Sequence, residues 1–220
     1  MNFLVELGHN FTDIKMAKEM IWVAKDCGAE IVKFQLYDID KIKIPSDIHY
    51  QELKDSQLTK EQTIELAEEC RKADMEFMAS AFDTERLGWL EDIGVRRHKI
   101  ASRSIFDQEL IKAMEKTGKP IIASLGAWKK KELPNIKADF LYCLTRKEIE
   151  TFGVRNFPEK FDELAGFSDH TIGIEWTMEA IDRGARIIEK HFTLDKNMAG
   201  CDQAGSATPK ELKTIIDYVK

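Results

Sequence analysis

Short apolar runs alternate with amphipathic segments along the whole chain, and this alternation most constrains the fold. The runs have the length of strands, and the segments between them carry apolar residues at helical spacing, many with capping residues before them and glycines after them. The predicted strands cover residues 3–7, 30–36, 76–81, 97–101, 120–125, 139–144, a run ending at 168, and 186–192. The clearest helices are predicted for residues 14–24, 59–72, 84–93, 107–116 and 175–183, with a last one from Pro209.

Eight strand–helix units in 220 residues predict an α/β fold, a (β/α)8 TIM barrel that forms a single domain over residues 1–220. An open doubly wound sheet is the alternative, but it seldom needs eight units and usually carries a glycine-rich first turn, which is absent here. Residues 37–57 show no sustained period and are predicted to form a long loop. Because active sites of such barrels lie at the carboxyl ends of the strands, polar residues there become the candidates.

Composition narrows the class of function. Hydrophobic residues make up 43% of the chain and charged residues 33%, which is typical of a globular protein. The net charge of −6 argues against a nucleic-acid surface, and no apolar stretch approaches the roughly 20 residues that span a bilayer. The first residues lack the features of a signal peptide, and the four cysteines show no paired spacing. We therefore expect a cytoplasmic protein with reduced thiols.

Two lysines, Lys33 and Lys99, lie inside predicted strands where a barrel normally carries Val, Ile or Leu. A buried lysine is costly unless it faces an anion. Together with hydroxyl groups at the strand ends, the two lysines predict a site for a small phosphorylated or carboxylated molecule. In the alternative interpretation, Lys33 pairs with Glu6 or Glu189 inside the barrel, and Lys99 belongs to an exposed strand start.

Two histidines end consecutive strands near the carboxyl terminus, each beside an acid. Asp169 directly precedes His170, and Glu189 stands two positions before His191. Imidazole and carboxylate ligands suit Mn, Fe, Co or Zn better than Mg. The pattern favours a divalent metal site over two structural histidines, whereas His9 stays undecided.

Several segments match a known family in order and spacing. The most specific are Phe-Ser-Asp-His-Thr-Ile-Gly at 167–173 and Glu-Lys-His-Phe-Thr-Leu at 189–194. Others are Val-Glu-Leu-Gly with His-Asn at 5–10, Ala-Glu-Ile-Val-Lys-Phe-Gln at 29–35, Ala-Ser-Ala-Phe-Asp at 79–83, Lys-Ile-Ala-Ser at 99–102 and Gly-Lys-Pro-Ile-Ile at 118–122. Over nearly its whole length the chain resembles the sialic acid synthase family, whose members condense phosphoenolpyruvate with N-acetylmannosamine or related sugars.

The resemblance implies a role for each matching position. His170 and His191 would bind a divalent metal, in the family usually manganese, with Co, Fe, Zn and Mg as alternatives. Lys33 and Lys99 would hold phosphoenolpyruvate. The remaining substrate contacts would come from Gln35, Ser80, Ser102, Thr145, Ser168 and Asp169. The acids that would serve the sugar, the water and the proton transfers are Glu6, Glu189 and Asp202.

The chain also departs from the family pattern. Arg103-Ser104 stand where the family usually has Gly-Glu, Thr145 replaces an expected asparagine, and Ser80-Ala81 replace Thr-Pro. The segment between the fifth and sixth predicted strands is too short for a full helix. We expect a chain without the antifreeze-like domain that follows the barrel in typical members, where that domain contributes to sugar binding. The resemblance therefore predicts the metal and the phosphoenolpyruvate site more firmly than the sugar.

Three hypotheses stay open at this point. In the first, a metal-dependent synthase joins phosphoenolpyruvate to an aldose, N-acetylmannosamine or a related sugar, and releases phosphate and a sialic-acid-like 2-keto sugar acid. In the second, a degenerate barrel without catalysis binds a ligand or partner in a sugar-modification pathway. In the third, a different aldol-type barrel enzyme uses the same metal and lysines. The expected partners are small molecules, with no nucleic acid and no membrane, and a homodimer is one possible assembly.

Overall fold

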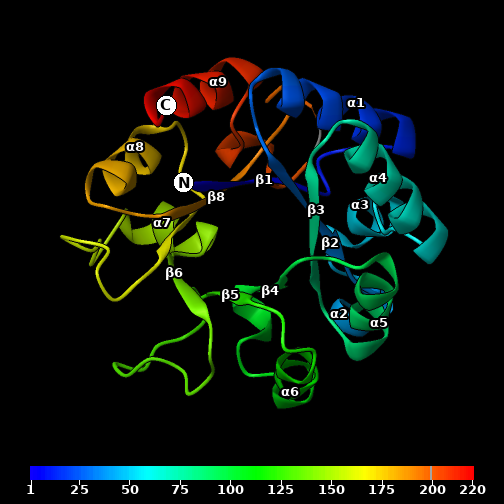
Figure 1. Ribbon diagram of the computed structural model, residues 1–220, viewed down its shortest axis with the longest axis horizontal. Helices are drawn as coiled ribbons and strands as arrows, with labels where there is room; N and C mark the ends of the chain where they lie inside the picture. The colour runs from blue at the N-terminus through cyan, green and yellow to red at the C-terminus, as the bar shows by residue number, and fades with distance from the viewer. Residues whose placement is uncertain (199) are drawn as a thin grey trace.

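The structure, a computed structural model, describes residues 1–198 and 200–220. In these residues eight parallel strands close into a barrel in chain order, and the last strand pairs with the first (Figure 1). The strands are β1 (Asn2–Gly8), β2 (Ile31–Leu36), β3 (Glu76–Ala81), β4 (His98–Ile100), β5 (Ile121–Ser124), β6 (Asp139–Cys143), β7 (Gly166–Asp169) and β8 (Ile187–His191). The predicted (β/α)8 fold is confirmed.

Helices surround the barrel, and their starts follow from local capping (Figure 1). Thr59 and Thr208 each form a capping box with the residue three positions later, and Asp13 accepts a hydrogen bond from the amide of Met16. The helices that follow the strands are α1 (Ile14–Asp26), α4 (Lys60–Lys72), α5 (Thr84–Ile93), α6 (Gln108–Lys116), α7 (Arg146–Phe152), α8 (Glu175–Asp182) and α9 (Pro209–Tyr218). None of the described helices has the length and apolar content that a membrane span needs.

Two connections differ from a regular strand–helix unit. The predicted loop at 37–57 contains two short helices, α2 (Ile39–Ile42) and α3 (Tyr50–Asp55). They are held by a small apolar cluster in which the Tyr37 hydroxyl donates to the Leu53 carbonyl at 2.8 Å. Residues 125–138, all of them described, connect β5 to β6 without a helix.

The barrel interior is built in layers, because side chains alternate along each strand. An apolar layer near the amino-terminal ends of the strands consists of Leu4, Ile31, Met78, Ile122, Leu141, Ala165 and Ile187. Two positions further along on five of these strands, the inward residues are polar instead: Glu6, Lys33, Ser80, Ser124 and Glu189. Ser168 on β7 and Lys99 on the short β4 belong to the same polar layer. The apolar layer therefore closes the barrel below a polar layer that faces the carboxyl ends.

Candidate active site

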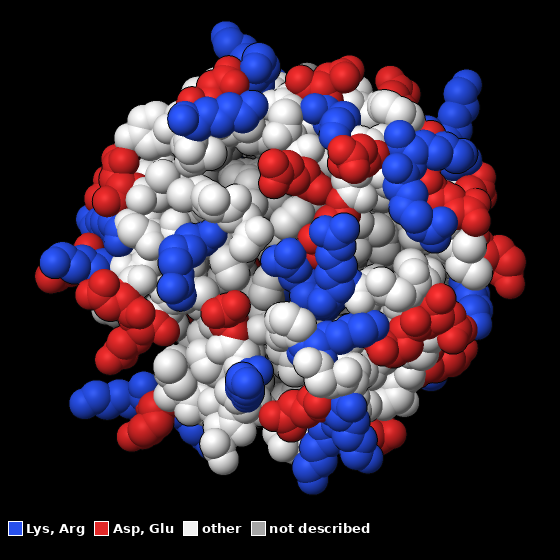
Figure 2. All heavy atoms as spheres, viewed as in Figure 1, with Lys and Arg blue, Asp and Glu red and all other residues white. Residues whose placement is uncertain are grey.

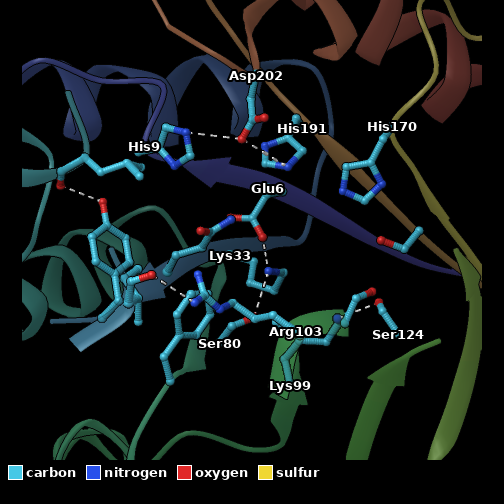
Figure 3. Close-up of a pocket in the computed structure, with 18 of the residues that line it drawn as sticks. Glu6, His9, Lys33, Ser80, Lys99, Arg103, Ser124, His170, His191 and Asp202 are labelled. Carbon is cyan, nitrogen blue, oxygen red and sulfur yellow. Dashed lines mark hydrogen bonds and ion pairs between the residues drawn. The ribbon is translucent and has the colours of Figure 1, made fainter. Parts of the chain in front are cut away.

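A cavity of about 310 Å³ lies at the carboxyl ends of the strands. Its floor is the polar layer of the barrel, and its rim comes from the loops that follow the strands. The face seen in Figure 2 mixes acidic and basic side chains, and basic ones gather near its centre. The side chains that line the cavity include Glu6, His9, Lys33, Gln35, Ser80, Lys99, Ser102, Arg103, Ser124, Ser168, His170, Glu189, His191 and Asp202 (Figure 3).

Both strand lysines end in the cavity floor. Lys33 pairs with the Glu6 carboxylate and donates to Ser80 Oγ at 3.2 Å. Lys99 donates to Ser124 Oγ at 2.7 Å (Figure 3). Glu189 lies between the two lysines, with one carboxylate oxygen 3.5 Å from each ammonium nitrogen. Lys33 thus pairs with both Glu6 and Glu189, as the alternative interpretation of the sequence expected. Both lysines still line the cavity.

Burial and charge set the protonation of this floor. Burial lowers the pKa of Lys33 to about 8, with Glu189 opposing the shift and Lys99 adding to it. Burial also raises the pKa of Glu189, but Lys33, Lys99 and a hydrogen bond from Ser168 at 2.7 Å outweigh it and hold that pKa well below its usual range. Glu189 is therefore ionised at neutral pH. Lys33, with a pKa of about 8, loses its proton only slightly above neutral pH.

The two histidines lie together on the opposite side of the cavity (Figure 3). The ring centroids of His170 and His191 are 5.5 Å apart, and Asp202 Oδ2 is 3.7 Å from His191 Nε2. Burial lowers the pKa of His191 to about 4, against the opposing effect of Asp202, so its ring is neutral and can donate a lone pair. His191 Nδ1 is buried without a hydrogen-bond partner among the described residues. Two imidazoles beside a carboxylate fit a divalent transition metal.

His170 has a second neighbour, the thiol of Cys143. The Cys143 Sγ atom lies 3.9 Å from His170 Nδ1. Burial lowers the pKa of His170, but the charges of Cys143 and Asp202 and the hydrogen bond to Cys143 outweigh it and raise the pKa to about 9. A metal at this ring must therefore compete with a proton.

Two of the predicted substrate-binding residues lie outside the cavity. Asp169 follows the inward Ser168, so it points out of the barrel, where Lys190 Nζ lies 2.9 Å from its Oδ2. Thr145 is the N-cap of α7 and forms a capping box with Glu148. The structure thus gives Asp169 a buried ion pair and Thr145 a helix cap, and neither residue lines the cavity. The other predicted substrate-binding residues do line the cavity: Lys33, Gln35, Ser80, Lys99, Ser102 and Ser168.

Some cavity residues were missing from the predicted site. Ser124 could have been found, because it stands two positions after Ile122 on β5 and must share its face. His9 directly follows the Val-Glu-Leu-Gly motif, but the sequence leaves its role undecided, and Cys201 carries no local signal because it lies in a loop. Arg103 stacks over Phe82, with its guanidinium carbon 5.3 Å from the ring centroid. The Arg103 guanidinium donates to the Ile42 carbonyl at 3.5 Å but has no ion pair among the described residues, and burial lowers its pKa.

Comparison with known proteins identifies the family. Residues 20–220 match the NeuB family. The chain belongs to this family. It is 33% identical to an uncharacterized protein of Methanocaldococcus jannaschii, over 97% of this chain and 68% of that one. It is 29% identical to N,N'-diacetyllegionaminic acid synthase of Legionella pneumophila, over 99% of this chain and 70% of that one.

A solved structure of a sialic acid synthetase is similar to this chain over nearly its whole length. N-acetylneuraminic acid (sialic acid) synthetase of Leptospira borgpetersenii, crystallised with citrate, superposes with a TM-score of 0.84 at 30% identity. The match covers 98% of this chain and 81% of the other. The chain is thus similar to sugar-acid synthases over its whole barrel, and its resemblance to the sialic acid synthase family is confirmed.

Proposed function

We propose that this NeuB-family chain is a metal-dependent synthase that condenses phosphoenolpyruvate with an aldose and releases phosphate. The observation that carries the proposal is the placement of Lys33 and Lys99 in one cavity with His170 and His191. One wall of the cavity thus suits a small polyanion, and the other suits a divalent metal. The sugar-acid synthases among its relatives support the same chemistry.

Phosphoenolpyruvate carries a phosphate and a carboxylate, so it needs cations and hydrogen-bond donors together. Lys33 and Lys99 supply the cations, Ser80 and Ser124 supply hydroxyl groups beside them, and Ser102 lines the same cavity. The lysines already balance Glu189 in the cavity floor. A bound anion would share these cations and raise the pKa of Lys33, because an opposite charge favours the ammonium form.

The reaction forms a bond between C3 of the enol phosphate and the aldehyde carbon of the sugar. The aldehyde oxygen takes up a proton, water adds at C2, and phosphate leaves from the resulting tetrahedral intermediate. We assign the proton transfers to Glu189, Glu6 and Asp202, the cavity carboxylates closest to the lysines and the histidines. A divalent metal, when bound by His170 and His191, supplies Lewis-acid polarisation of the aldehyde. Manganese is the metal we propose.

The acceptor would enter from the rim, where Arg103, Phe82, His49 and Tyr37 line the cavity. The relatives include legionaminic, pseudaminic and N-acetylneuraminate-9-phosphate synthases, which differ in their sugars. We propose N-acetylmannosamine or a related amino sugar as the acceptor.

Phosphate release tests the proposal. The protein is incubated with phosphoenolpyruvate, Mn²⁺ and a panel of aldoses that includes N-acetylmannosamine, its 6-phosphate and 2,4-diacetamido sugars. We expect phosphate release with at least one sugar, and a 2-keto acid product by mass spectrometry. Lys99→Met should abolish release, whereas Lys119→Met, which removes a lysine paired with Glu91 outside the cavity, should not. Tight phosphoenolpyruvate binding without release with any sugar would instead support a barrel that only binds.

A further inference from the structure

Beside the histidine pair lies a second group of side chains with metal-binding atoms. His9 follows β1, and Cys201 and Asp202 lie in the loop between β8 and α9. His9 Nε2 is 3.1 Å from Cys201 Sγ and 3.2 Å from Asp202 Oδ2. The three ligand atoms all lie within 4.8 Å of one another. Figure 3 shows Asp202 between the rings of His9 and His191.

The thiol and the carboxylate approach the same nitrogen of His9. A catalytic relay uses the two ring nitrogens of a histidine for two different partners. Here Nε2 meets both partners, while Nδ1 is buried and has no hydrogen-bond partner among the described residues. One nitrogen has either one proton or one lone pair, so it cannot serve both neighbours well. Three donors that converge on one point are instead the arrangement of a cation site.

The spacing also fits a tetrahedral cation. Bonds of about 2.3 Å to sulfur and about 2.0 Å to nitrogen or oxygen place tetrahedral ligands roughly 3.5 Å apart. The distances of 3.1 and 3.2 Å from His9 Nε2 need only a small adjustment to reach that value. A further carboxylate lies nearby, because Glu52 accepts a hydrogen bond from the Cys201 amide at 2.9 Å. Among the described residues the ion pairs of Asp202 are with His9 and His191 alone.

We propose that His9, Cys201 and Asp202 form a second cation site, for a thiophilic divalent ion of the zinc class. The ligand sets of the two sites differ. A thiolate selects zinc or cobalt, whereas the imidazoles of His170 and His191 with water and carboxylate oxygens also accept manganese. Cys201 gives up its proton when the ion binds. The two sites share Asp202, whose Oδ2 also lies 3.7 Å from His191 Nε2. The test of the second site reads metal binding and not the synthase reaction, so either proposal can fail without the other.

A competing set shares the same thiol. His49, Glu52 and Cys201 also bring three ligand atoms within 4.8 Å. The side chains of His49 and Glu52 are 39% and 31% exposed, whereas that of His9 is 7% exposed. A site nearer the protein interior holds its ligands more rigidly and excludes more water, so we assign the ion to the His9 set.

Cobalt is the probe, because a cobalt–thiolate bond gives a strong charge-transfer absorption in the near ultraviolet. The full chain, treated with a chelator, is titrated with Co²⁺, and bound metal is counted by elemental analysis. We expect the thiolate band in the wild type, its removal by one equivalent of Zn²⁺, and its loss in Cys201→Ser. Circular dichroism shows whether that variant is folded. His9→Ala should weaken Co²⁺ binding at this site by at least about tenfold, since even outer-shell changes cost that much.

Matched variants separate this site from its neighbours. Cys143→Ser removes the other thiol near the histidine pair, and His170→Ala removes a ligand of the first site; both should keep the band. His49→Ala should keep it as well. The proposal is overturned if the wild type shows no band, if the band survives Cys201→Ser, or if it disappears with Cys143→Ser or His49→Ala.

Discussion

The ion pair between Asp169 and Lys190 should be essential for stability and irrelevant to substrate binding. Both side chains are 0% exposed, and Lys190 Nζ lies 2.9 Å from Asp169 Oδ2 and 3.0 Å from the Thr171 carbonyl. The other acceptor positions of Asp169 are filled by the Thr171 amide and hydroxyl at 2.7 Å and by the Thr177 hydroxyl at 2.6 Å. Asp169→Asn puts an amide NH₂ among these donors and leaves Lys190 without its counterion.

Removing one member of a buried, hydrogen-bonded pair costs about 3–5 kcal/mol, because the remaining charge is left uncompensated. In a domain of this size, each kcal/mol lowers the midpoint of heat unfolding by about 2–4 °C. Asp169→Asn and Lys190→Met should therefore each lower the midpoint by about 6–20 °C. The double variant should lose less than the sum of the two, because the second change removes a charge that the first had already orphaned.

Heat unfolding followed by circular dichroism measures the effect, and Lys213→Met is the control. Lys213 pairs with Asp217 at 3.0 Å on the surface, with both side chains more than half exposed, so its loss should cost at most about 0.5 kcal/mol. The KM for phosphoenolpyruvate should stay unchanged in folded Asp169→Asn. An unchanged midpoint together with a raised KM would refute the reasoning and restore Asp169 to the substrate site.

Three further predictions concern the cavity. The kcat/KM for phosphoenolpyruvate should fall as the pH rises above about 8, where Lys33 loses its charge. An active Lys33→Arg variant should keep its rate to higher pH. A flat wild-type profile to pH 10 would contradict this. His170→Ala and His191→Ala should each lower phosphate release at least about a hundredfold and weaken Mn²⁺ binding in calorimetry, because Lewis-acid polarisation contributes several kcal/mol; full activity in either variant would rule out the metal assignment. Arg103→Ala should raise the KM for phosphorylated or acidic aldoses about tenfold more than for neutral ones. The reason is that the Arg103 guanidinium has no carboxylate partner among the described residues and is free to pair with an anionic sugar. Equal changes for both classes of aldose would exclude a charge contact.

Strand periodicity explains why so much of this fold could be predicted. The prediction for residues 76–81 matches β3 at both ends, and the alternation along such strands separates the apolar layer from the polar one. The same rule places Asp169 outside the cavity. Since Ser168 faces the barrel interior, its neighbour Asp169 must face the helices, where it pairs with Lys190.

Features that depend on contacts between distant segments could not be predicted. Residues 37–57 showed no period because α2 and α3 are too short to display one, and the cluster around Tyr37 forms only in three dimensions. His9 and Cys201 are 192 positions apart, so no local pattern joins them. The same holds for Arg103, whose ring partner Phe82 belongs to the loop after a different strand.

The seam between β1 and β8 also has a consequence for folding. In the register of this pair, Glu6 lies opposite His191 and Leu4 opposite Glu189, so the cavity joins the first strand of the barrel to the last. Contacts between such distant segments form late, because a long loop must close before they contribute. A chain in which β1 and β8 are not yet paired would have the lysines and the histidines but no cavity that they share. The appearance of ligand binding during refolding should therefore mark the moment when the first and last strands pair.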